Sequence, residues 1–531
     1  MGRSHGSKYN SMDFSGTVLL IASDGRKLLL PIPSKSPHDP LGWSTGKRVL
    51  AFISLIEFYI VAQVLVLAPE FLLQSFESDP TLTDREPFSL ATTMTVPTLT
   101  LGIGGFIWLP LSLVLGRKPV LVFCNVLLAL GTAWAAAAPN FYHLLAAICT
   151  QGLAAGSVFS LMISIIIDMT FIQERPQAIA MFWGIGGGVS TAISSMVPLL
   201  SRGDDRSWSR FYWAWSIACV ISVVTTLIFV AETFYVRPPV AYDGRVLVQN
   251  GHEKVNIYED WEQVPGGKIL PGLSQRPDKQ RSCHFFAGSR LGSWKDMAAC
   301  YPQTMLCLCN PRIFWVMLLN AANFAGMMSI GTTFPILLRS PPYNFQSQTI
   351  ALVNLAAAVG SFVAWPAAGA LVQSISHRLT RRNQGIRHAE YYLPAFILPV
   401  VASAASCILY GITAENKLHW ILVYVSYFLN SFAYSASGVA NTLWVTEALP
   451  RWAAPGLIVV GGVSYIISVS MSFSIQPWLD SQGFTMMNIE IAIGILLIGI
   501  IGVPVAFWGK GVRQHMNGRW RAFEAGALRP Q

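Results

Sequence analysis

Long runs of apolar residues, separated by polar segments, fill most of this 531-residue chain. A helix needs roughly 20 apolar residues to cross the hydrocarbon layer of a bilayer, and twelve stretches of the chain meet that length. They cover residues 49–69, 93–115, 119–138, 143–167, 177–199, 209–231, 313–338, 348–372, 394–412, 418–444, 453–476 and 487–508. A soluble domain has no means of keeping so many uniformly apolar helices in water. The pattern predicts an all-α membrane protein with twelve transmembrane helices.

Charged residues are scarce, and their positions orient the predicted spans. They make up 12% of the chain, against roughly 25% in soluble domains. With the N-terminus taken as cytoplasmic, 30 of the 36 Lys and Arg residues fall on the cytoplasmic side. This positive-inside bias predicts that both termini are cytoplasmic. Topology and contact with anionic lipid then explain the net charge of +9, so we expect the lipid bilayer, and no nucleic acid, as a partner.

A long polar segment divides the twelve spans into six plus six. We predict a cytoplasmic tail (1–48), a first six-helix bundle (49–231), a cytoplasmic central loop (232–311), a second six-helix bundle (312–508) and a cytoplasmic tail (509–531). The central loop mixes Pro, Gly and charged residues without sustained helical periodicity, which is typical of a linker. Two bundles of this kind place a substrate path at their interface, near the bilayer midplane.

Sequence motifs of enzymes and metal sites are absent. The chain has no phosphate-binding G-x-x-x-x-G-K-[ST] loop, and its glycine-rich run at residues 184–188 lies within a span and follows no strand. Cys307 and Cys309 form a C-x-C pair without a second pair at zinc-binding spacing. We therefore expect no enzymatic activity, no cofactor and no metal.

Several short motifs carry a family resemblance. They are DPLGW (39–43), LPLSLVLGRKPV (109–120), Gln151-Gly152, DMTFIQER (168–175), ETFYVR (232–237) and RRNQGIRHAEYYLP (381–394). With twelve spans and a long central loop, this set resembles the major facilitator superfamily. Within it the chain is similar to a fungal branch of drug:proton antiporter-like and polyamine-transporter-like proteins. The resemblance implies a secondary transporter whose two bundles rock around a central site, with protons as the coupling ion.

The chain departs from the superfamily pattern at three places. Leu113 and Val114 stand where an Asp-Arg pair is usual, so the acid that can meet a helix N-terminus there is missing. Ile148 stands where span four usually carries an Arg. Span five lacks the Gly-Pro pair frequent in antiporters. Proton antiport is therefore implied by the resemblance alone.

Glu57 is the only acid well inside a predicted span. An ionisable side chain at membrane depth costs at least about 2.5 kcal/mol by insertion scales, so it is expected to face the bundle interior or an aqueous cavity. We expect Glu57 to contact a cation or to carry a proton. The alternative is a carboxyl group hydrogen-bonded to a neighbouring helix. Gln63, six positions on, is a second candidate for the same path.

Polar side chains also occur within the spans of the second half. The candidates for the substrate path are Asn323, Asn354, Tyr427, Asn430 and Tyr434. The last three recur at spacings of three and four, which predicts one aromatic and polar face on span ten. Such a face suits flat or cationic substrates. The alternative for the amides is that they hold helices together, at about 0.6 kcal/mol each.

Charges at the predicted cytoplasmic membrane edge form a candidate gate. The set comprises Gly116, Arg117, Lys118, Asp168, Glu174 and Arg175. Arg117 and Lys118 also anchor the topology. The alternative for the acids and Arg175 is that they are solvated edge charges, because surface pairs contribute only about 0–1 kcal/mol.

Glycine pairs at a spacing of four mark two further helix faces. They are Gly152 with Gly156, and Gly184 with Gly188. Small residues at this spacing let helices approach closely in a membrane. We expect these four glycines to serve helix packing rather than substrate contact.

These observations predict a monomeric secondary transporter that works by alternating access. The favoured role is proton-coupled export of a small organic molecule, such as a secondary metabolite, across a fungal cell membrane, with the vacuolar membrane as another location. The first alternative is uptake of an organic cation or polyamine, with Glu57 as the partner of the cation. The second alternative is a transporter-like sensor that binds a ligand without net transport.

Overall fold

The structure is a computed structural model of the chain. It describes residue 31 and residues 39–83, 85–90, 92–200, 206–235, 294–383, 386–448 and 452–505, together with three short strands. The strands are β1 (Thr17–Leu19), β2 (Val246–Gln249) and β3 (Val255–Tyr258). The remaining parts of the predicted tails and central loop lie outside the described residues.

Eight helices and one π-helical turn build the first half of the molecule. They are α1 (Thr45–Ser78), α2 (Thr92–Leu115), α3 (Arg117–Ala136), α4 (Phe141–Ala155), η3 (Val158–Met162), α5 (Ile163–Met169), α6 (Arg175–Ser194), α7 (Val197–Leu200) and α8 (Ser207–Phe229). The segments α4, η3 and α5 form one continuous crossing, as do α6 and α7. Short 3-10 turns, η1 (Pro40–Gly42) and η2 (Pro80–Leu82), flank α1.

The second half is also built mainly from helices. Its elements are α10 (Trp294–Cys309), α11 (Pro311–Arg339), α12 (Ser347–Ala351), α13 (Val353–Arg382), β4 (Ile386–His388), η5 (Ala389–Phe396), α14 (Ile397–Glu415), α15 (Ile421–Ala448), α16 (Ala453–Leu457), η7 (Ile458–Val463) and α17 (Ser464–Ile500). The helix α10 lies within the segment predicted as the central loop and packs against α2, α11 and α16.

The described helices are consistent with twelve crossings of a membrane. Among the described residues, nine helical segments are long and apolar enough to span a bilayer. One of them, Ala453–Val505, holds two crossings, because Gly483 interrupts it with a φ of +77°. Two more crossings, α6 and α15, fall outside the nine; α6 is rich in glycine, and α15 carries Ser, Tyr and Asn side chains. The predicted fold class, an all-α membrane protein, is confirmed, and the arrangement of its helices is consistent with the predicted twelve spans.

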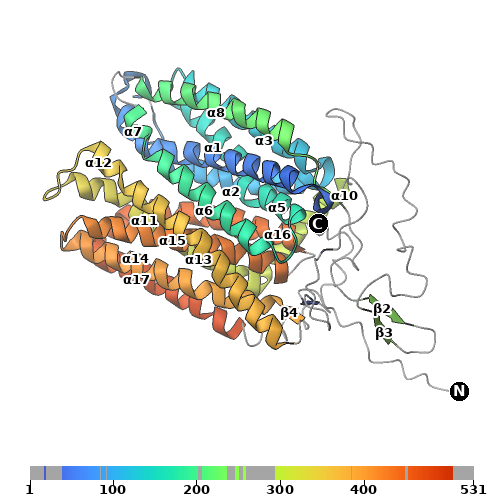
Figure 1. The fold of residues 1–531 in the computed structure, drawn as a ribbon. Helices are drawn as coiled ribbons and strands as arrows, with labels where there is room; N and C mark the ends of the chain where they lie inside the picture. The colour runs from blue at the N-terminus through green and yellow to red at the C-terminus, as the bar shows by residue number, and fades with distance from the viewer. Residues whose placement is uncertain are drawn as a thin grey trace.

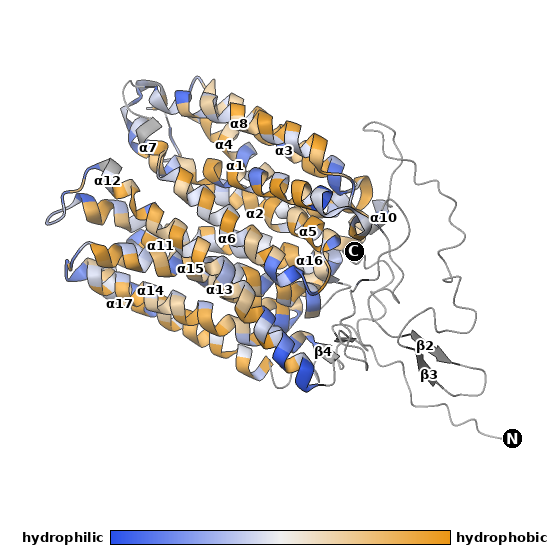
Figure 2. Cartoon of the chain, viewed as in Figure 1, coloured by the Kyte–Doolittle hydropathy of each residue, from blue (hydrophilic) through white to orange (hydrophobic). Residues whose placement is uncertain are grey.

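The outer surface of the bundle is apolar, as a lipid-facing surface must be. Leu130, Ile217 and Ile228 are largely exposed, although each lies within a predicted span. Figure 2 shows hydrophobic residues along the lengths of the helices and hydrophilic ones mostly near the ends. The exposed apolar side chains therefore form the surface that the hydrocarbon layer covers.

The two halves meet along two sets of helices. In Figure 1 the blue to green first half lies beside the yellow to red second half. Across this boundary α6 packs against α13 and α15, and α2 packs against α17 and η7. We call the face at which α1, α3 and α11 begin the tail face, and the opposite one the far face. The strand β1 pairs antiparallel with β4, so the N-terminal segment contacts the second half.

Glycines allow the closest of these contacts. A Cβ atom on Gly156, which caps the end of α4, would lie 2.7 Å from the Cα of Gly104 in α2. A Cβ atom on Gly184 of α6 would lie 2.6 Å from the Cβ of Trp365 in α13, across the boundary between the halves. Added atoms at such distances force the helices apart.

We expect Gly156→Ala to lower the melting temperature of the purified protein, because overpacking a tight contact costs about 1–3 kcal/mol. The matched control is Gly494→Ala in α17, where a Cβ would meet nothing within 4 Å. Alanine there should be neutral or stabilising, since it favours helix over glycine by about 1 kcal/mol. Thermal melting of both variants in detergent tests the contact. Equal melting temperatures would show that α2 and α4 tolerate the added methyl group.

Candidate functional site

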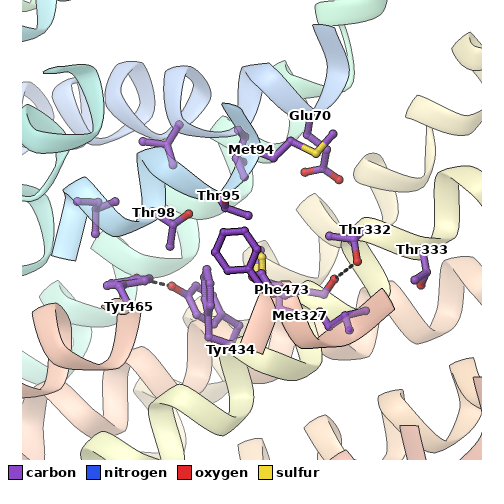
Figure 3. Close-up of a pocket in the computed structure, with 18 of the residues that line it drawn as sticks. Glu70, Met94, Thr95, Thr98, Met327, Thr332, Thr333, Tyr434, Tyr465 and Phe473 are labelled. Atoms are coloured by element: carbon purple, nitrogen blue, oxygen red, sulfur yellow. Dashed lines mark hydrogen bonds between the residues drawn. The ribbon is translucent and has the colours of Figure 1, made fainter. Parts of the chain in front are cut away.

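A cavity of about 230 Å³ lies between the two halves. It is lined by Gln63, Val66, Leu67, Glu70, Met94, Thr95, Thr98, Leu101, Phe159, Phe324, Met327, Met328, Gly331, Thr332, Thr333, Tyr434, Tyr465, Ser472, Phe473, Ile475 and Gln476. We call this the central cavity (Figure 3). Its residues come from the second half of α1, the start of α2 and the second half of α11, with others from η3, α15 and α17. The central cavity therefore lies toward the far face.

Glu70 carries the carboxylate of the central cavity. Sequence reasoning missed it because the predicted span ended at Pro69, whereas α1 runs through this proline to Ser78. Membrane helices tolerate proline because neighbouring helices satisfy the freed backbone groups. The continued helix puts Glu70 two turns beyond Gln63, and both line the cavity. Glu57 is therefore not the only acid within the first span. A helical stripe of Gln63, Leu67 and Glu70 was the available signal.

An aromatic cluster closes the central cavity on its tail-face side. It consists of Tyr59, Phe159 and Trp183 from the first half and Phe324, Tyr434 and Tyr465 from the second. The rings of Phe159 and Trp183 stack at 5.3 Å, and those of Phe159 and Tyr465 lie 5.2 Å apart. The hydroxyl groups of Tyr434 and Tyr465 share a hydrogen bond of 2.5 Å, drawn in Figure 3. Because these contacts join the halves, they block the path toward the tail face.

A buried ion pair joins the halves closer to the tail face. Arg175 begins α6 in the first half, and its Nη1 donates to Oε1 of Glu447, near the end of α15, at 2.7 Å. Both side chains are 8% exposed. A charge-assisted hydrogen bond in such a buried place is strong, and the loss of one partner leaves the other charge uncompensated. Arg175 was predicted as a gate residue, whereas Glu447 had no sequence signal, because its span seemed to end at residue 444.

The other predicted gate residues lie within the first half. Arg117 forms a buried ion pair with Asp168 and donates from Nη1 to the carbonyl of Ser164 at 3.2 Å. Glu174 lies 3.5 Å from Arg48. The first contact links α3 to α5, and the second links the start of α1 to the residue before α6. These contacts therefore brace one bundle rather than join the two.

Glu232 supplies a carboxylate to the N-terminus of α3. Gly116 precedes that helix with a φ of +100°, a conformation that glycine adopts without strain. The backbone N–H groups of Arg117 and Lys118 then donate to Glu232 at 3.0 and 3.2 Å. A negative charge is favourable at a helix N-terminus. The acid that is missing at Leu113 is thus replaced here by one that follows α8.

The remaining predicted path residues lie away from the central cavity. Glu57 accepts a hydrogen bond of 2.7 Å from Thr225, at the contact of α1 with α8. Asn323 donates to Ser437, and Asn430 donates to Ser406, each at 3.2 Å. These side chains join helices within one half.

Two more candidates are held locally. Asn354 donates to the carbonyl of Ala351, three residues before it. The ring of Tyr427 packs on Phe334, 5.3 Å away. Of the seven predicted path residues, the structure thus brings Gln63 and Tyr434 to the central cavity. Among the described residues, no group of three His, Cys, Asp or Glu side chains gathers where it could hold a metal ion.

The four predicted packing glycines all face other helices closely. Gly152 and Gly156 of α4 face α2. Gly184 and Gly188 of α6 face α13, and a Cβ on Gly188 would lie 3.0 Å from the ring of Phe362. None of the four lines the central cavity.

A cavity between two helical halves is the arrangement in which secondary transporters bind their substrates. The profile of the Major Facilitator Superfamily matches residues 49–456, and the chain belongs to this superfamily of transporters.

Similar proteins support this assignment along the whole chain. The chain is 20% identical to the Uncharacterized MFS-type transporter C1271.10c of Schizosaccharomyces pombe, over 93% of this chain and 89% of the relative. It is 22% identical to Citrate exporter 1 of Aspergillus niger, over 82% and 81% respectively. The solved structure of the proton:xylose symporter XylE shares the fold, with a TM-score of 0.57 at 13% identity, covering 88% of this chain and 96% of XylE.

We expect Glu447→Gln to open the tail face, because it leaves Arg175 buried without its counter-charge. Removing one partner of such a pair costs about 3–5 kcal/mol. The readout is the alkylation rate of a cysteine introduced at Thr442, which lies behind the pair and bonds Trp183 of the other half. The rate should rise at least about tenfold, as about 1.4 kcal/mol already changes a population tenfold.

The charge-reversed double variant Arg175→Glu/Glu447→Arg should restore slow alkylation. Arg48→Ala is the matched control, since the Arg48–Glu174 pair lies within one half. All variants would carry Cys309→Ser, which removes an exposed native thiol. Unchanged alkylation in Glu447→Gln would show that the pair does not hold the tail face closed.

Proposed function

We propose that this protein exports a small organic molecule across a fungal membrane by alternating access, in exchange for protons. The observation that carries the proposal is the central cavity, which lies between the halves and is closed at the tail face by the aromatic cluster and the Arg175–Glu447 pair. Membership of a transporter superfamily supports it.

The positive-inside bias makes the tail face cytoplasmic. The structure then corresponds to a state in which the cytoplasmic end of the path is shut. A substrate would enter from the cytoplasm after Arg175 and Glu447 separate and the aromatic rings of the two halves move apart. The return to the present arrangement would leave the central cavity toward the outside.

Two considerations, a similar protein and the sequence motifs, support export rather than uptake. One relative is named Citrate exporter 1, so export occurs among proteins similar to this chain. The fungal resemblance of the motifs also favours an exporter. Citrate itself does not fit the acidic lining of the central cavity, so the cargo differs from that of this relative.

Proton coupling requires a carboxyl group that can load and release a proton during the cycle. We assign this role to Glu57, which is only partly buried and accepts a hydrogen bond from Thr225. It lies thirteen residues from Glu70, about 20 Å along α1 at 1.5 Å per residue. A proton at Glu57 and a substrate at Glu70 would therefore be coupled through movement of α1, not by direct competition.

The direction of transport is tested in cells that carry or lack the gene. We expect the gene-deleted cells to retain a higher intracellular level of at least one small organic molecule, and complementation to reverse this. Untargeted metabolite profiling of cells and medium is the measurement. A lower intracellular level on deletion would indicate uptake instead. Unchanged levels across the profile would favour a sensor.

Glu57→Gln should abolish pH-gradient-driven flux in reconstituted vesicles, because an amide cannot carry the proton. Counterflow exchange without a gradient should persist. Glu77→Gln is the matched control, since Glu77 is an exposed acid on the same helix. Gradient-driven flux of wild-type size in Glu57→Gln would remove this carboxyl group from the coupling scheme.

A further inference from the structure

The charge of the central cavity lining restricts the molecules that it can hold. Among the described residues, the lining includes one carboxyl group, that of Glu70, and no Lys, Arg or His side chain. A carboxylate or phosphate ligand would find no positive partner in this lining, and an ionised Glu70 would repel it. Burying an uncompensated charge is costly. The lining therefore disfavours anions.

Glu70 is placed to receive a positive charge. Its Oε1 atom is buried and has no hydrogen-bond partner among the described residues. In front of it lies Gly331 of α11, where even an added Cβ atom would stand 3.8 Å from that oxygen. Figure 3 shows the Glu70 carboxyl group on the Thr332 and Thr333 side of the cavity, away from the tyrosine pair. A bound cation would stabilise the ionised form of this carboxyl group at membrane depth, and the free space beside it leaves room for one.

The walls away from Glu70 suit an apolar body. Phe159, Phe324 and Phe473 contribute rings, as do Tyr434 and Tyr465. Ring faces attract cations within about 6 Å and also stack on flat groups. Three methionines, Met94, Met327 and Met328, add polarizable side chains that adapt to irregular shapes.

We infer that the central cavity binds a monovalent organic cation, with its charged nitrogen at Glu70 and its apolar body among the aromatic and Met side chains. The inference rests on the proposed transport function and adds the class of substrate. One carboxylate balances one positive charge. A second ammonium group on the same ligand would enter largely apolar walls without a partner, at a high desolvation cost.

A matched series of small aromatic probes tests this inference on the purified full chain in detergent. The series is 2-phenylethylamine (a cation near neutral pH), 2-phenylethanol (neutral) and phenylacetate (an anion). We expect the wild type to bind the cation at least about tenfold more tightly than the alcohol, an energy difference of about 1.4 kcal/mol, and to bind phenylacetate most weakly. Isothermal titration gives the three affinities.

Variants assign the preference to Glu70. In Glu70→Gln the advantage of the cation over the alcohol should vanish, while the affinity for the alcohol stays within about twofold. Glu77→Gln should behave as wild type, because this exposed acid of α1 does not line the cavity. Gly331→Val should weaken amine binding by filling the space before the carboxylate, with the charge retained. Melting temperatures close to wild type would show that these variants are folded.

Several outcomes would overturn the inference. They are equal wild-type affinity for amine and alcohol, tightest binding of phenylacetate, and equal loss of amine and alcohol in Glu70→Gln. Tighter binding of the dication 4-(aminomethyl)phenethylamine would overturn the single-charge claim. Binding in detergent needs no gradient, so these results leave the transport cycle untouched. Cation binding at Glu70 without any flux in vesicles would instead contradict the proposed function.

Discussion

The scarcity of hydrogen-bond partners in the hydrocarbon layer determines where polar side chains can lie in this protein. Polar side chains within a membrane must find partners inside the protein or line an aqueous space. Many buried amides and hydroxyls here meet that condition, as Asn488 does by accepting from Ser329 and donating to the carbonyl of Phe484. Glu70 is one of the exceptions, since its Oε1 atom has no such partner in the described part of the chain. This exception lies at the central cavity, where a ligand can supply the hydrogen-bond partner that the protein does not.

The closure of the path at the tail face also follows from the need of buried polar groups for partners. Arg175 and Glu447 are buried together because each compensates the charge of the other. Between this ion pair and the central cavity, the aromatic cluster excludes water with apolar ring faces and one hydrogen-bonded pair of hydroxyl groups. The ion pair and the aromatic cluster close the path by different interactions. Water that reaches the ion pair weakens it, whereas the rings must slide past each other, so opening of the tail face requires movement of whole helices.

The sequence predicts the fold well because apolar length alone specifies a membrane crossing. It predicts the site less completely, for reasons visible at particular residues. Glu70 was overlooked because a hydropathy-based span stops at a proline, while the helix continues through Pro69. Tyr427, Asn430 and Tyr434 share a sequence spacing, yet they contact three different neighbours, since span ten is surrounded by helices on most sides. Arg175 and Glu447 are 272 residues apart in the sequence, so their pairing leaves no local sequence pattern.

The pairing of β1 with β4 has a consequence for how the molecule can be observed. Thr17 aligns with His388, and Leu19 aligns with Ile386, so the beginning of the chain is hydrogen-bonded to the bundle that the end of the chain builds. A fluorophore fused near the N-terminus would therefore report the position of the second bundle. Energy transfer from that fluorophore to a dye on the first bundle would follow the rocking of one half against the other.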